Sequence, residues 1–147
     1  PKYDGETQTE FEKFMSDNGE LENPQLKKDF DAIIAAIKKI IDDCGARENL
    51  FRPEGNNIKA IPLCIEQRRG KGVGTLRLYC IRISGKILII GNGGIKRVKR
   101  YEDDPILLDI VNKLRSIEHQ IFIGTRKIHA DYDDYQKVKM IIEAITI

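Results

Sequence analysis

Apolar residues recur at helical spacing near the start of the chain. Thr9 and Glu12 stand at the spacing of a capping box, and Asn18-Gly19 is typical of a helix end. Between these signals, three apolar residues share one face: Phe11, Phe14 and Met15. The pattern predicts a short amphipathic helix between Thr9 and Gly19.

A second and longer helical pattern follows. Asn23-Pro24 combines a capping residue with a proline in the first turn, and Gly45 ends the pattern directly after Cys44. The apolar positions between them recur at helical spacing: Leu26, Phe30, Ile33, Ile34, Ile37, Ile40 and Ile41. The sequence therefore predicts a second amphipathic helix that ends at Gly45.

Strand patterns replace helical spacing in the middle of the chain. Ile58–Ile65 is mostly apolar and β-branched, with Pro62 marking an edge or a bulge, and Thr75–Ile83 alternates between two faces. Ser84-Gly85 predicts a tight turn into a third strand, Lys86–Ile90. Four residues rich in glycine, 91–94, then interrupt this strand, and Ile95–Arg100 is interpreted as its bulged or bent extension.

Two further helices are expected after the strands. Asp104-Pro105 predicts the start of one, whose inward residues would be Ile106, Leu107, Ile110, Val111, Leu114 and Ile117. Asp133 or Asp134 would cap a last helix near the C-terminus. The element order predicts an α+β fold in one domain over residues 1–147: two N-terminal helices, an antiparallel meander of three to four strands, and one or two C-terminal helices packed on one sheet face. The other face would be left to basic residues.

Composition limits the class of protein. The chain has 147 residues, of which 41% are hydrophobic and 33% charged, so it can form a core and is not wholly disordered. No apolar run approaches the ~20 residues of a bilayer-spanning helix, and the polar N-terminus indicates no signal peptide, or one already removed. Cys44, Cys64 and Cys80 are odd in number and lack metal-ligand spacing, which favours reduced thiols in a cytoplasmic protein.

Charge is segregated along the chain. Residues 67–101 contain ten basic and no acidic residues, and thus carry +10, whereas the remainder carries −8. This distribution favours an anionic partner such as nucleic acid. Pairing of these cations with the acidic N-terminal helices is the alternative, although isolated surface pairs contribute only ~0–1 kcal/mol.

No metal, cofactor or covalent catalytic site is expected. His119 and His129 lack metal-ligand spacing, and the acidic groups at 102–104 and 131–134 are explained by helix capping. The glycines at 70, 72 and 74 predict a basic hairpin loop rather than a nucleotide cradle. For Gly91-Asn92-Gly93-Gly94, a plain turn and a backbone ligand cradle remain equal alternatives.

Two tyrosines accompany the basic segment. Tyr79 and Tyr101 are candidates for stacking on a nucleic-acid base. The alternatives are core packing against a helix for Tyr79 and a contact at a helix entry for Tyr101. Both interpretations remain open from the sequence.

Three motifs carry a resemblance to a known family: Thr75-Leu76-Arg77-Leu78-Tyr79, the run from Lys86 to Lys96, and the basic residues that follow it. With the preceding helices, this order resembles the RelE/HigB/ParE superfamily of type II toxin–antitoxin toxins, which includes phage-related host-inhibition proteins. The resemblance covers about Asn23 to Leu114, and residues 121–147 look like a C-terminal elaboration.

The resemblance implies metal-independent cleavage of mRNA, commonly at the ribosome, by attack of a 2′-hydroxyl on the neighbouring phosphorus. By position, it implies catalytic roles for Arg77, Lys96, Arg97 and Tyr101. It also implies RNA contacts from further residues: Arg68, Arg69, Lys71, Tyr79, Lys99 and Arg100. The sequence identifies no general base, because Lys59 is the only lysine of its strand and no histidine lies in the basic segment.

The expected partners are mRNA, the ribosome and a cognate antitoxin protein laid across the basic face, with no membrane. Enzymatic activity itself stays open. The alternative is a non-catalytic module that binds nucleic acid or protein through the same face, as in gyrase inhibition of the ParE type. A third interpretation is a homo-oligomer whose interface is the basic face.

Overall fold

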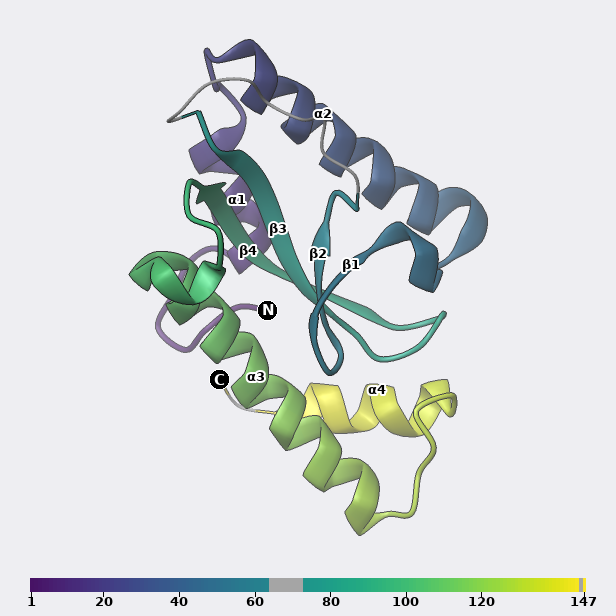
Figure 1. Cartoon of the computed structure of the whole chain (residues 1–147). Coiled ribbons are helices and arrows are strands. Elements are labelled where there is room, and N and C mark those ends of the chain that lie inside the picture. Colours follow the sequence, from purple (N-terminus) through teal and green to yellow (C-terminus); the bar gives the residue numbers. More distant parts are fainter. Residues whose placement is uncertain (64–72, 146) are drawn as a thin grey trace.

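The computed structural model describes residues 1–63, 73–145 and 147 and arranges them as helices around one antiparallel sheet (Figure 1). The strands are β1 Arg52–Gly55, β2 Ile58–Ile61, β3 Thr75–Arg82 and β4 Leu88–Lys96. The α-helices are α1 Glu10–Asn18, α2 Pro24–Lys39, α3 Pro105–Lys127 and α4 Tyr135–Ala144. The expected α+β class, with helices before and after the strands, is confirmed.

Both N-terminal helices begin where their capping residues predict. The Thr9 hydroxyl accepts a hydrogen bond from the Glu12 backbone N–H, and the Glu12 carboxylate accepts one from the Thr9 backbone. The Asn23 side chain accepts hydrogen bonds from the first turn of α2. After Lys39 the helix continues as one π-helical turn, Ile40–Cys44, and ends at Gly45, whose φ of 66° favours glycine.

The strands form a meander in the order β1-β2-β3-β4, each paired with its neighbour in sequence. The sequence analysis missed β1, because Pro53 and Gly55 are poor strand formers. A turn at Asn56, whose φ is 47°, joins β1 to β2. The strand predicted over Ile58–Ile65 is shorter in the described residues, since β2 ends at Ile61.

The glycine-rich segment does not interrupt β4. The strand runs through it, and Leu78 pairs with Gly93 whereas Cys80 pairs with Ile90. Two residues of β4, Gly91 and Asn92, therefore oppose the single residue Tyr79 as a β-bulge. The expected bulge is confirmed, but it lies inside one continuous strand rather than between two strand pieces.

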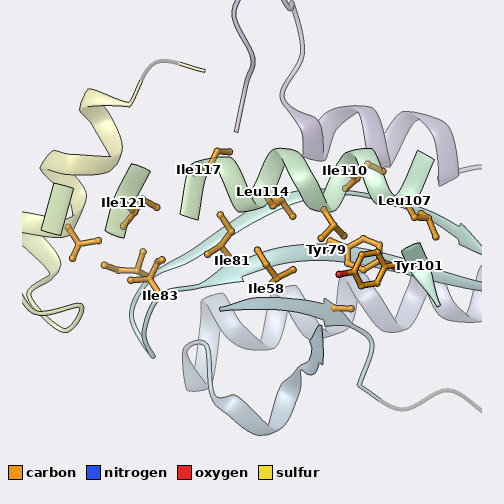
Figure 2. Packing of buried hydrophobic residues seen from close by; sticks show 14 residues of the cluster. Ile58, Tyr79, Ile81, Ile83, Tyr101, Leu107, Ile110, Leu114, Ile117 and Ile121 are labelled. Carbon is orange, nitrogen blue, oxygen red and sulfur yellow. The ribbon is translucent and has the colours of Figure 1, made fainter. Parts of the chain in front are cut away.

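Helices cover both faces of the sheet, so the expectation of a bare basic face is wrong. On one face, α1 and α2 pack against the sheet through a core that includes Phe14, Ile33, Leu76, Leu78 and Cys80. On the other face, α3 lies along the strands (Figure 1). Figure 2 shows its buried residues aligned over Ile58, Tyr79 and Ile81: Leu107, Ile110, Leu114, Ile117 and Ile121.

The C-terminal elaboration begins inside α3, which extends to Lys127 without a break. Asp104 caps this helix as predicted, but Ile106 is 72% exposed and does not face the core. Asp134, not Asp133, caps α4 by accepting a hydrogen bond from the Lys137 N–H. The two termini meet, since Asp4 N–H donates to the Ile147 carbonyl at 2.5 Å.

The described cysteines are free thiols. Cys44 is a partly buried free thiol and Cys80 a buried one, whereas Cys64 lies outside the described residues. Burial raises the pKa of the Cys80 thiol above its usual range.

In the parts of the chain that the structure describes, none of the helices combines the length and the apolar character that crossing a bilayer requires.

Candidate functional site

Strand register brings four charged side chains to one end of the α3-facing side of the sheet. Paired residues share a face, and alternate residues along a strand return to it. Arg52 pairs with Ala60, which pairs with Tyr79, and Thr75 pairs with Lys96. This placement puts Arg52 and Glu54 of β1, Arg77 of β3 and Lys96 of β4 on the same face. We call these four residues the sheet-end cluster.

Arg77 lies at the bottom of the sheet-end cluster and is only 4% exposed. Its Nη1 donates a hydrogen bond to the Pro62 carbonyl, whereas its Nε is buried without a hydrogen-bond partner among the described residues. Burial lowers the pKa of Arg77, the charge of Arg52 lowers it further, and Glu54 opposes both effects. Arg77 is thus a buried cation that strengthens the positive potential of the cluster.

Lys96 is partly buried beside the same groups. Burial lowers the pKa of Lys96, the carboxylate of Glu54 raises it, and the cations Arg52 and Arg77 lower it again. Its pKa therefore lies below the ordinary lysine value, which makes the ammonium a better proton donor. Within the cluster, three cations share one face of the sheet with one carboxylate, an excess of positive charge that suits a bound anion.

Glu54 contacts Arg52, with the Oε1 of Glu54 3.6 Å from the Nε of Arg52. The Glu54 side chain is 11% exposed, whereas that of Arg52 is 50% exposed. Arg52 therefore forms the solvent-facing side of the cluster, and Glu54 lies beneath it. Glu54 supplies the carboxylate of the cluster, and carboxylate oxygens accept hydrogen bonds.

Tyr101 lies beside the sheet-end cluster with its ring in the core. It is buried and packs edge to face against Tyr79, with ring centroids 6.0 Å apart (Figure 2). The Nη2 of Arg115 donates a 2.6 Å hydrogen bond to the Tyr101 hydroxyl. Burial raises the pKa of Tyr101, and the nearby Arg115 opposes that effect. The hydroxyl of Tyr101 thus accepts a hydrogen bond from Arg115, and its ring is not available for stacking.

The other expected site residues lie elsewhere. Tyr79 is fully buried, so its expected stacking on a base is wrong and the core-packing alternative holds. Arg97, Lys99 and Arg100 are exposed in the segment after β4, where Arg100 lies 3.6 Å from Glu102. The basic hairpin residues Arg68, Arg69 and Lys71 lie outside the described residues. The register therefore unites Arg77 and Lys96, whereas Arg97 occupies the exposed segment beyond them.

Two other basic residues, Lys59 and Arg82, pair with an acid that lies after the N-terminal helices. Glu48 accepts contacts from the Nζ of Lys59 at 2.8 Å and from the Nη1 of Arg82 at 2.6 Å. These residues lie on the α2-facing side of the sheet, because Lys59 pairs with Cys80. Lys59 is thus separated from the sheet-end cluster by the sheet itself.

Gly91 and Gly94 allow close packing of a helix on β4. A β-carbon on Gly91 would stand 2.9 Å from a methyl carbon of Leu114, and one on Gly94 would stand 3.3 Å from Leu107. Both leucines belong to α3, so the glycines allow this helix to approach β4 closely. The plain turn raised by the sequence therefore gives way to a packing role for Gly91 and Gly94 within β4.

Arg52 and Glu54 are the site residues that the sequence analysis missed. A signal was present, because apolar Phe51 and Pro53 alternate with these two charged residues directly before the turn at Asn56. Alternation of that kind is typical of a half-buried strand. Across residues 1–63, 73–145 and 147, no three His, Cys, Asp or Glu side chains gather closely enough to hold a metal ion.

Comparison with protein-family models, with curated proteins and with solved structures finds no match to this chain.

Proposed function

We propose that this chain is a toxin-type endoribonuclease of the kind that the RelE/HigB/ParE resemblance implies, and that the sheet-end cluster is its active site. The observation that carries the proposal is the gathering of Arg52, Arg77 and Lys96 around Glu54 on one face of the sheet. Such a cluster combines cations for a phosphate with an acid and a base at the same place.

The reaction would proceed by transfer of the phosphoryl group to the neighbouring 2′-oxygen. Glu54 accepts the proton of the 2′-hydroxyl as its oxygen bonds to phosphorus. The bond from phosphorus to the 5′-oxygen breaks, and the Lys96 ammonium donates a proton to that leaving oxygen. Arg52 and Arg77 stabilise the negative charge that develops on the phosphoryl oxygens. The products are a 2′,3′-cyclic phosphate and a 5′-hydroxyl end.

The wider setting of this activity belongs to the same proposal. The substrate is mRNA on the ribosome, and a cognate antitoxin protein neutralises the chain in the cytoplasm. Because α3 covers much of the face that was expected to be open, the RNA enters at the end of the sheet where Arg52 is half exposed. The exposed cations Arg97, Lys99 and Arg100 then hold the flanking backbone.

A translation assay tests the proposal. Purified protein is added to an mRNA in a translating extract and, with and without EDTA, to the isolated RNA, and cut ends are mapped by primer extension. We expect discrete cuts in the translated mRNA. Cuts that also form in the isolated RNA with EDTA would show that cleavage is independent of ribosomes. Glu54→Gln keeps the side-chain shape but removes the base, so cleavage should fall at least about 100-fold.

Lys28→Ala is the matched control. This exposed lysine lies on α2, on the opposite side of the sheet, and its loss changes the net charge by one unit, as Glu54→Gln does in the other direction. Cleavage by Lys28→Ala should equal that of the unaltered protein. Intact mRNA at high protein concentration, or full cleavage by Glu54→Gln, would contradict the ribonuclease proposal.

A non-catalytic binding module is the second candidate, and the contact between Glu54 and Arg52 favours it. A carboxylate that is paired and largely covered can serve to hold Arg52 in place instead of accepting a proton. In that case the protein binds RNA or inhibits gyrase without cutting RNA, and RNA binding weakens steeply as salt rises. Lys96→Met then weakens RNA binding. Neither the unaltered protein nor Glu54→Gln cleaves RNA.

A further inference from the structure

A pocket of about 720 Å³ lies between the β1–β2 turn, α3 and the segment before α4, two residues along the chain from Glu54 of the sheet-end cluster and toward the opposite end of β3 from Lys96. Its wall is formed by Asn56, Asn57, Arg115, Glu118, His119, Phe122 and Tyr132. The four α3 residues stand at i, i+3, i+4 and i+7 and so form one stripe of the helix. The volume is in the range of pockets that hold small organic ligands, about 300–1,000 Å³.

Two side-chain contacts involve residues of the pocket wall. The carboxylate of Glu118 accepts a 3.0 Å hydrogen bond from the Asn57 N–H, which ties α3 to the β1–β2 turn. On the next turn, the Arg126 guanidinium lies 5.4 Å from the centre of the Phe122 ring. Phe122 itself is 44% exposed, and the cation–π contact to its ring comes from Arg126.

Two features of the pocket favour a flat aromatic ligand with polar edges. Phe122 and Tyr132 offer ring surfaces, and the side-chain amides of Asn56 and Asn57 can both donate and accept hydrogen bonds. The carboxylate of Glu118 disfavours a second phosphate at the same place. A nucleobase meets these requirements, because it combines a π face with donors and acceptors along its edge.

Arg115 connects this pocket to the sheet-end cluster. Its Nη2 donates to the Tyr101 hydroxyl at 2.6 Å and would lie 4.0 Å from a β-carbon on Gly55, the residue directly after Glu54. The same guanidinium also lines the pocket. A strand of RNA that occupies both places would therefore pass Arg115, whose guanidinium suits a backbone phosphate between them.

We propose that this pocket binds one nucleobase of the RNA strand whose phosphate occupies the sheet-end cluster. The inference rests on the proposed function, which it deepens by adding a base subsite built from the C-terminal half of α3 and the segment before α4. Phe122 and Tyr132 stack on the base, and Arg115 holds the backbone between the two sites.

Binding measured with two oligonucleotides separates this proposal from the proposed function. The first is a ten-nucleotide 2′-O-methyl RNA that contains all four bases and cannot be cleaved. The second has the same length and phosphates but abasic residues throughout. Phe122→Ala should weaken binding of the first about tenfold or more and leave binding of the second unchanged, because only base stacking is lost. Lys96→Met should weaken binding of both.

Matched variants keep the result interpretable. Phe122→Leu retains apolar volume and lacks an aromatic face, so it should bind the base-containing RNA as weakly as Phe122→Ala while melting at the temperature of the unaltered protein. Tyr135→Ala removes an equally exposed aromatic ring that does not line the pocket, and it should bind like the unaltered protein.

The outcomes are distinct. Equal weakening of both oligonucleotides by Phe122→Leu, or no weakening of either, overturns the base subsite. If Lys96→Met also leaves binding unchanged, the cluster is not a phosphate site and the proposed function falls as well. If Phe122→Leu selectively weakens the base-containing RNA but no RNA is ever cut, the base subsite stands and the ribonuclease activity does not.

Discussion

A β-carbon on Gly93 would stand 1.8 Å from the backbone carbonyl oxygen of Arg77, so the two strands can approach as they do only because Gly93 has no side chain. Gly93→Ala should therefore force β4 away from β3 and lower the free energy of unfolding by about 3 kcal/mol or more. Chemical denaturation followed by circular dichroism measures this loss.

Gly85→Ala is the control for that substitution. Gly85 lies in the turn before β4, and a β-carbon there would meet no atom within 4 Å. We expect its free energy of unfolding to stay within about 0.5 kcal/mol of the unaltered protein. If Gly93→Ala were equally harmless, the close approach of the strands at the bulge would be wrong.

The Tyr79 hydroxyl gives a second prediction. It is buried without a hydrogen-bond partner among the described residues, and such a group costs about 1–3 kcal/mol. Tyr79→Phe should therefore raise the free energy of unfolding by about 1 kcal/mol and leave RNA binding unchanged, since the ring is inaccessible. Thermal melting and RNA titration check both parts. Weaker RNA binding by Tyr79→Phe would contradict the conclusion that Tyr79 takes no part in RNA binding.

Lys96 should oppose stability while it serves function. Its pKa in the folded protein lies below the ordinary value of 10.5. Burial is the main cause, and the charges of Arg52 and Arg77 add to it, whereas Glu54 opposes them. The unfolded chain thus binds this proton more tightly, and the charged lysine lowers stability at every pH below its folded pKa. Lys96→Met should therefore melt at a higher temperature at pH 7, and cleavage should fall at least about 100-fold. A lower melting temperature would show that Lys96 stabilises the fold.

Glu10, unlike Lys96, should stabilise the fold through its charge, and this contribution should be lost in acid. Burial opposes its ionisation, but hydrogen bonds from Lys13 and Asn92 and the charge of Lys113 outweigh burial and hold its pKa below 4.5. The contribution of Glu10 is complete above pH 4.5 and is lost as the pH falls through the lowered value. Glu10→Gln should cost about 1–2 kcal/mol at pH 7 and progressively less in acid.

Denaturation at a series of pH values measures this difference. The exposed Glu20→Gln variant should match the unaltered protein throughout. A deficit of Glu10→Gln that does not change between pH 7 and pH 3 would contradict the charge-based role of Glu10.

The fold was predictable where local chemistry decides it. Thr9, Asn23 and Asp104 cap their helices because a short polar side chain can replace a missing backbone partner, whatever lies around it. Long-range packing was not predictable in the same way. Nothing in the pattern of α3 shows that it covers the sheet face opposite α2, and Ile106 fits the helical period yet lies beyond the edge of that contact.

The candidate site was predictable only in part. Arg77 and Lys96 lie on strands that the alternation and the glycine motif reveal, so both were found. Glu54 and Arg52 lie on a four-residue strand with a proline and a glycine, and only pairing with β2 brings them to the other two. For Tyr79 the sequence left stacking on RNA and core packing open, because a tyrosine on a basic strand suits both, and its full burial favours the core.

The pairing of every strand with its neighbour in sequence also bears on how the chain folds. Each hairpin of the meander closes a short stretch of chain, which costs little loop entropy. Docking of α1 on β4, by contrast, joins residues about eighty positions apart, as the bond between Glu10 and Asn92 illustrates. The transition state for folding should accordingly contain the β3–β4 hairpin with α3, and the N-terminal helix should dock afterwards.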